Sequence, residues 1–93
     1  MAELIHQFLE PFVEDDSDTQ YSVRIYGDHS GGLWHGWIEF YPLDAGDVRR
    51  TGRETDQVSR HQLAFWATGL SGIYLEGAFD RAVPVDEQRA PSP

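Results

Sequence analysis

The sequence predicts a single α+β domain, in which an antiparallel sheet of three to five strands carries one main helix, residues 59–68, on one face. Residues 21–27 and 33–41 alternate apolar and polar side chains with the period of two of a half-buried strand. Residues 59–68 begin and end with helix-capping signals. The chain of 93 residues, 40% hydrophobic and 13% aromatic, suffices for one core. We therefore place the domain at residues 1–83, and we predict that the polar, proline-containing residues 84–93 form a disordered tail.

Residues 2–13 fit either a short helix or an edge strand. Their apolar side chains have helical spacing, but a proline within the segment ends any helix early. We favour the strand, because an isolated helix of about two turns is only marginally stable. Residues 14–20, rich in acidic side chains, Ser and Thr, predict a turn. Residues 27–32 then predict the loop of a hairpin that joins the strands at 21–27 and 33–41.

The predicted hairpin has two chemically different faces. Trp34, Ile38 and Phe40 share the face that we assign to the core, because successive side chains of a strand point to opposite sides. The other face mixes large aromatic rings with ionisable groups, and its members are Tyr26, His35, Trp37, Glu39 and Tyr41. A sheet with aromatic side chains on both faces needs cover on the second face, from the same chain, a second copy or a partner. These five residues are the candidate contact face.

The segment after the hairpin predicts a turn and a third strand. PLDAGD at 42–47 is typical of a turn, and VRRTGRET at 48–55 fits a strand in which Gly52 indicates a bulge or a close backbone approach. A helix then begins at Ser59, whose hydroxyl and the Gln62 side chain fit a capping box. Its end is predicted at Thr68, with Gly69 as a left-handed cap. After it, IYLEG at 73–77 reads as a short strand, and the following residues fit a turn of helix or continued extension.

The third strand also holds the basic concentration of the sequence. Arg49, Arg50 and Arg53 form an anion-binding candidate, because guanidinium groups pair well with carboxylates and phosphates. The alternative is internal pairing with neighbouring carboxylates, since residues 47–60 carry four arginines against three acidic side chains. We favour internal pairing, which is typical of mixed charge runs.

The overall charge limits the partners of the chain. Sixteen acidic residues against seven basic ones, all of them arginine, give a formal net charge of −9. A phosphate backbone is repelled on average by such a protein, so we do not expect a nucleic-acid partner. No apolar run approaches the ~20 residues of a membrane span, and no basic segment with a long apolar stretch begins the sequence. We therefore expect no membrane association and a cytoplasmic location.

The sequence assembles no catalytic or metal-binding motif. It has no cysteine, and its histidines, His6, His29, His35 and His61, lack the spacing of metal-ligand pairs. The acidic turn at 14–20 imitates the first ligands of a calcium loop, but the required glycine and final glutamate are missing. We expect no catalytic residue, metal site or cofactor. A small metal-dependent or hydrolytic enzyme centred on His35 or His61 stays open as an alternative.

Three short stretches carry a resemblance to a known family. The hairpin exits through IEFYPLD at 38–44, continues into TGRETD at 51–56, and is followed by a helix that leads into YLEG at 74–77. In this order of elements, residues 21–77 resemble the HicB-type antitoxins of bacteria. The resemblance implies a short antiparallel sheet followed by a helix, similar to a trimmed RNase H domain. It carries over no catalytic or toxin-binding residue.

The aromatic second face and the missing catalytic motifs together predict the class of function. We expect a non-catalytic protein-interaction or self-associating module that uses this sheet face, with a protein partner or a second copy as its ligand. The alternative is an antitoxin-like regulator that binds a basic partner, for which the acidic charge is the relevant feature.

Overall fold

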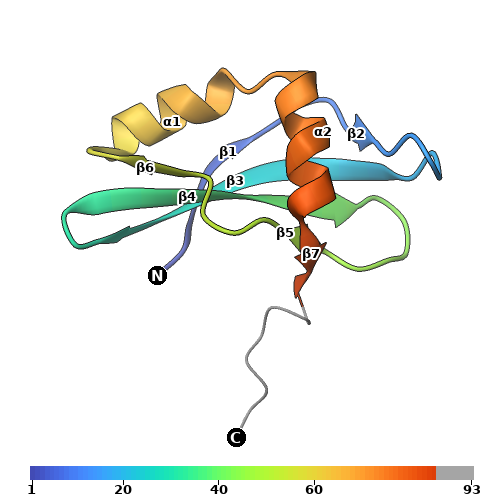
Figure 1. The fold of residues 1–93 in the computed structure, drawn as a ribbon, viewed down its shortest axis with the longest axis horizontal. Helices are drawn as coiled ribbons and strands as arrows, with labels where there is room; N and C mark the ends of the chain where they lie inside the picture. The colour runs from blue at the N-terminus through green and yellow to red at the C-terminus, as the bar shows by residue number, and fades with distance from the viewer. Residues whose placement is uncertain (86–93) are drawn as a thin grey trace, which may run out of the picture.

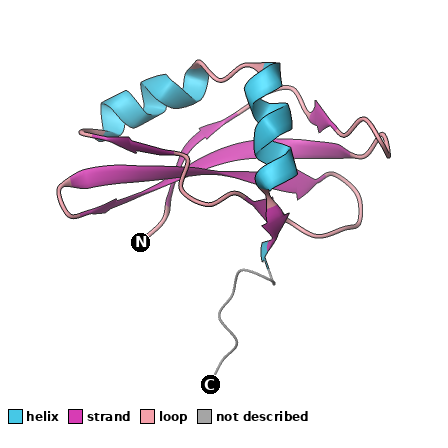
Figure 2. Cartoon of the chain, in the orientation of Figure 1, coloured by secondary structure: helices cyan, strands magenta, loops and turns pink. Residues whose placement is uncertain are grey.

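The computed structural model describes residues 1–85, which form two layers, a sheet and a pair of helices (Figure 1). The elements in chain order are β1 (Glu3–Gln7), β2 (Phe12–Val13), β3 (Gln20–Ser30), β4 (Leu33–Pro42), β5 (Arg49–Arg50), β6 (Thr55–Gln57), α1 (Arg60–Thr68), α2 (Gly72–Arg81) and β7 (Val83–Pro84). All strand pairs are antiparallel. The predicted α+β class is confirmed, although the sheet has seven strands and a second helix stands where we predicted a strand (Figure 2).

The long hairpin of β3 and β4 is the centre of the sheet. Its strands pair in one unbroken register as far as Ser30, which lies opposite Leu33. Gly31 and Gly32 make the turn with φ angles of 61° and 81°. This left-handed region is what a two-residue hairpin turn needs, and glycine adopts it without steric penalty. The loop predicted at 27–32 is therefore mostly strand.

Short strands extend the sheet on both sides of the hairpin. β1 and β2 pair with β3, β5 and β6 pair with β4, and β7 pairs with β5. The strand that we favoured for the N-terminal segment is thus present. The third strand predicted at 48–55 is divided into β5 and β6. Between them, the Thr51 hydroxyl takes the place of a backbone carbonyl as the hydrogen-bond acceptor for β4. This hydroxyl accepts the Ile38 N–H at 3.0 Å, and the residue is 1% exposed.

The ordered fold extends past the predicted end of the domain at residue 83. Pro84 lies opposite Arg49 in the ladder between β7 and β5, and the Val85 N–H donates to the Val48 carbonyl at 2.8 Å. The prediction that the disordered tail begins at residue 84 is therefore wrong for these two positions. The rest of the predicted tail, residues 86–93, lies outside the described residues.

Helix α1 begins where the sequence predicts. The Ser59 hydroxyl accepts the Gln62 N–H at 3.1 Å, which is the hydroxyl half of the predicted capping box. The predicted left-handed cap is wrong, because Gly69 has a φ of −93°. The Gly69 N–H instead closes a tighter last turn by donating to the Trp66 carbonyl at 3.2 Å.

The strand predicted at 73–77 is wrong, because these residues belong to α2. Ser71 caps this helix by accepting the Tyr74 N–H at 3.1 Å. Leu75, Ala78 and Phe79 then lie buried on one side, at the i, i+3 and i+4 positions of a helix. A short apolar run fits a strand and a buried helix equally well, so packing against the sheet decides between them.

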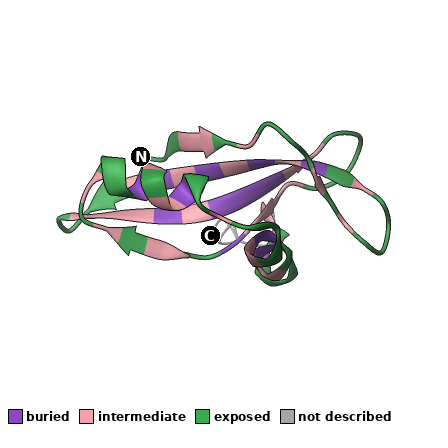
Figure 3. Ribbon diagram, turned by 90° about the horizontal axis from the view of Figure 1, so that it is seen from above, coloured by how far each residue is buried: buried purple, intermediate pink, exposed green. Residues whose placement is uncertain are grey.

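The core lies between the helices and one face of the hairpin. Val23, Ile25, Ile38 and Phe40 supply its sheet side, and each is at most 1% exposed. Figure 3 shows the buried positions along the middle of the two long strands and on α2. The residues that face them from the helices are Leu63, Ala67, Leu75, Ala78 and Phe79. α1 runs along the hairpin and α2 across it, so both helices cover the same face (Figure 1).

Helix α1 approaches the sheet closely at a pair of glycines. Gly27 and Gly36 lie opposite each other in the hairpin, and a Cβ atom at either position would come within 2.6 Å of a Leu63 methyl group. Because Gly27 and Gly36 have no side chain, they leave the space that Leu63 fills, and we call this space the glycine seat.

Trp34, which we predicted for the core, points to this face but is only half-buried near the hairpin tip. There it stacks on His29 with ring centroids 5.2 Å apart.

Replacing Leu63 with Ala should lower the free energy of unfolding by about 2–5 kcal/mol, because the change leaves a cavity at the glycine seat. Urea denaturation followed by circular dichroism measures the loss. Phe65→Ala on the same helix is the matched control, since this side chain is 77% exposed. Equal losses in the two variants would contradict this account of the core.

Candidate functional site

The sheet face turned away from the helices is the candidate site, and we call it the open face. The hairpin register places Tyr26 opposite Trp37, Arg24 opposite Glu39, and Asp28 opposite His35 on this face. β5 adds Arg50 opposite Glu39. All five residues of the predicted contact face, Tyr26, His35, Trp37, Glu39 and Tyr41, lie here, because the strand alternation predicted from the sequence is present.

Glu39 is the centre of the open face. Its carboxylate accepts the Trp37 Nε1–H at 2.8 Å and the Tyr41 hydroxyl at 2.5 Å. The Arg50 Nε lies 3.7 Å from the same carboxylate. Although no described helix covers this face, Glu39 is only 9% exposed, because its neighbours close over it. A buried carboxylate with charged and polar partners of this kind fixes the positions of the rings around it.

The rings and guanidinium groups of the open face form a continuous layer. Tyr26 and Trp37 stack with centroids 6.4 Å apart. The Arg24 guanidinium lies 3.9 Å from the Tyr41 ring centroid, and the Arg50 guanidinium lies 5.7 Å from that of Trp37. Cation–π contacts of this kind orient both partners. Arg24 and Arg50 were absent from the predicted contact face, although strand alternation already assigns Arg24 to the side of Tyr26.

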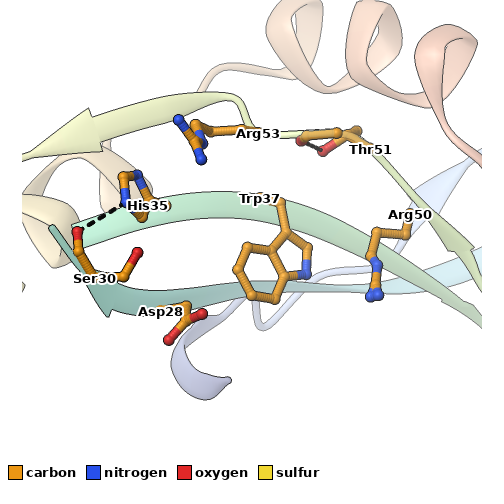
Figure 4. A pocket seen from close by; sticks show the side chains of 8 residues that line it. Asp28, Ser30, His35, Trp37, Arg50, Thr51 and Arg53 are labelled. Carbon is orange, nitrogen blue, oxygen red and sulfur yellow. Dashed lines mark hydrogen bonds between the residues drawn. The ribbon is translucent and has the colours of Figure 1, made fainter. Parts of the chain in front are cut away.

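A cavity of about 280 Å³ opens beside Trp37 at one end of this face (Figure 4). Its lining residues are Asp28, Ser30, His35, Trp37, Arg50, Thr51, Gly52 and Arg53. Figure 4 shows the Trp37 indole between Arg50 and the end of the cavity formed by His35 and Arg53. The lining therefore combines one large aromatic surface with two guanidinium groups and one carboxylate.

The predicted anion-binding cluster is divided by the sheet. Arg50 and Arg53 line the cavity on the open face. Arg49 points to the helix side, where its guanidinium lies 5.2 Å from the Phe79 ring centroid. Of the pairing with neighbouring carboxylates that we favoured, Arg53 lies 3.6 Å from Asp56, whereas Arg50 lies near Glu39 of β4 instead. Neighbouring residues in β5 point to opposite faces, so a cluster in sequence does not converge in space.

His35 uses both of its ring nitrogens within the fold. Nδ1 lies 2.6 Å from the Asp56 carboxylate, and Nε2 lies 3.1 Å from the Ser30 carbonyl oxygen. Neither nitrogen is available to a metal ion in this arrangement. His61 lies exposed in the first turn of α1. Within residues 1–85, no group of three or more His, Asp and Glu side chains is placed to hold a metal ion.

Fold and site together define the class as a two-layer α+β domain with a half-exposed aromatic and arginine-bearing sheet face. Compared with protein-family models, curated proteins and solved structures, the chain matches none. No helix within residues 1–85 is long and apolar enough to cross a membrane.

The stability of the domain should fall above pH 10 through Tyr41. Burial, and after it the hydrogen bond to Glu39, raises the pKa of Tyr41 above its ordinary value of 10.0. The folded protein thus retains a proton that the unfolded chain releases first, so this stabilisation is complete below pH 10 and is lost as the pH rises toward the folded pKa. Tyr74 adds to the same trend, because burial and a hydrogen bond to Glu54 raise its pKa to about 12.

Urea unfolding at a series of alkaline pH values measures this loss. Tyr41→Phe should reduce the slope of stability against pH, and Tyr74→Phe should reduce it separately. A wild-type slope in Tyr41→Phe would mean that the Glu39 network does not hold the phenol proton.

Proposed function

We propose that this chain is a non-catalytic protein-interaction module that binds a second copy of itself or another protein through the open face. One observation supports the proposal most strongly. Trp37, Tyr26 and Tyr41 lie together with Arg24 and Arg50 on a face that no described helix covers. Trp, Tyr and Arg are the residue types that contribute most of the binding energy in protein interfaces.

The open face is also pre-ordered, which favours binding. Glu39 holds the Trp37 N–H and the Tyr41 hydroxyl inward, so the polar atoms of both rings are already satisfied before a partner arrives. A side chain that is fixed in advance loses less conformational entropy on association. The carboxylate thus organises the face without contacting the partner itself.

The cavity beside Trp37 gives the interface a preferred chemistry. Arg50 and Arg53 line the cavity together with the carboxylate of Asp28, and they lie 3.7 Å from Glu39 and 3.6 Å from Asp56 respectively. Asp28 is itself 3.0 Å from the N-terminal amine. An acidic side chain of the partner is the group that fits there, because guanidinium groups bind carboxylates with well-defined geometry.

A second candidate is a regulator of the antitoxin type that binds a basic partner, and the net charge of −9 favours it. Its complex would weaken steeply with salt, because the attraction between exposed charges is screened within about 10 Å at 0.1 M ionic strength. The bacterial setting that we propose rests on the resemblance to HicB-type antitoxins, and the cytoplasmic location on the hydropathy pattern of the sequence.

Trp37→Ala should weaken association about tenfold or more, as expected for a central interface tryptophan. Light scattering over a concentration series measures self-association. For a different partner, a photo-crosslinking residue at exposed Gln7, next to Arg24 in the sheet, should capture it from cells. The same crosslinker at Phe65, which is 77% exposed on the helix side, is the matched control.

Circular dichroism must show that Trp37→Ala keeps the wild-type fold. A wild-type chain that stays monomeric, and forms no crosslink from Gln7 beyond the Phe65 background, would refute the proposal.

A further inference from the structure

A second surface lies on the helix side of the molecule, between α2 and the segment around β2. Two hollows of about 330 and 180 Å³ open there, and they share Phe12, Val13 and Glu76 as lining residues. We call the two hollows together the α2 groove. One wall is the face of α2 that carries Glu76, Phe79 and Asp80, and the other is the segment from Phe8 to Asp16.

The floor of the α2 groove is apolar. Its floor residues are Phe8, Phe12, Val23, Leu70, Leu75 and Phe79. The rings of Phe12 and Phe79, one from each wall, lie 5.2 Å apart, so the two walls are in contact at the floor. Val13, at the edge, is 45% exposed, so apolar surface reaches the solvent here. Concave apolar surface of this kind favours burial by a partner side chain.

All of the charged residues that line the groove are acidic. Its rim residues are Glu10, Glu14, Asp15, Asp16, Glu76 and Asp80. No basic residue lines either hollow, and none of the six carboxylates forms an ion pair within the described part of the chain. Other carboxylates differ in this respect, since Glu3 pairs with Arg60 and Glu54 with Arg81.

The arginines of residues 1–85 have other contacts. Arg53, Arg60 and Arg81 lie in ion pairs, while Arg24 and Arg50 lie on the open face. Arg49 lies over the Phe79 ring without lining the groove. Within residues 1–85, each arginine of a second copy is therefore already in contact with groups of its own chain, which disfavours a second copy as the occupant of the groove. The complementary occupant is a different protein that carries its own positive charges.

We propose that the α2 groove docks a basic amphipathic helix of a partner protein. Apolar side chains at i, i+3, i+4 and i+7 would rest on the floor, and flanking Lys and Arg side chains would meet the rim carboxylates. The apolar floor supplies burial, and the acidic rim selects positive over negative segments. This site is separate from the open face and does not depend on the function proposed there.

The test uses the full chain and a fluorescent synthetic peptide of about 15 residues, with Leu at i, i+3, i+4 and i+7 and Lys elsewhere. Fluorescence anisotropy measures its affinity. Glu76→Gln combined with Asp80→Asn should weaken binding about fivefold or more, because two rim charges are lost. Asp44→Asn combined with Asp47→Asn is the matched control, since both residues are exposed in the turn after β4 and the charge change is the same.

The Asp44→Asn and Asp47→Asn control variant should change the affinity less than about twofold, because it alters only the net charge and not the groove. A peptide with Ser in place of Leu should bind at least about fivefold more weakly than its parent, because it lacks the apolar anchors. Trp37→Ala should bind the Leu/Lys peptide like the wild type, which separates this site from the open face. The proposal would be overturned if the two double variants lost affinity equally, or if the Glu76→Gln and Asp80→Asn variant lost none. Equal binding of the Ser peptide and its Leu parent would also overturn it.

Discussion

The unbroken antiparallel register between β3 and β4 is the constraint on which the rest of the structure depends. Side chains alternate across a strand, so one register assigns every residue of the hairpin to a face. It places Ile38 and Phe40 under the helices, and Trp37 and Glu39 on the opposite side. A shift by one residue would exchange these sets, burying a carboxylate in the core. The two-glycine turn, which permits a single tight connection, maintains this register.

The two faces of the hairpin are covered in different ways. On the helix side, the paired glycines let α1 approach until Leu63 fills the space above them. On the open face, no described helix supplies cover, and the side chains cover one another around Glu39 instead. The result is a polar network beneath an aromatic surface. Such a network orders the rings in the isolated domain and leaves their outer surface for a partner.

The two proposed surfaces lie on opposite sides of the sheet and have opposite chemical character. The open face gathers Arg24 and Arg50 from an overall acidic chain, together with tryptophan and tyrosine. The α2 groove combines an apolar floor with carboxylates that form no ion pair within residues 1–85. A partner suited to one surface is therefore repelled by charge from the other. Under the two proposals, this acidic chain would have two distinct binding preferences.

The sequence by itself determined the features that arise within a few residues: the alternation of the hairpin, its two faces and the Ser59 cap of α1. These signals are local, because side-chain period and capping hydrogen bonds depend on nearby positions. Contacts between distant segments decided the rest. IYLEG became helix because its apolar residues pack on a sheet formed by earlier segments of the chain, and pairing of β5 with β7 placed Pro84 in the sheet. Such pairings depend on burial across the whole fold, which no short stretch of sequence records.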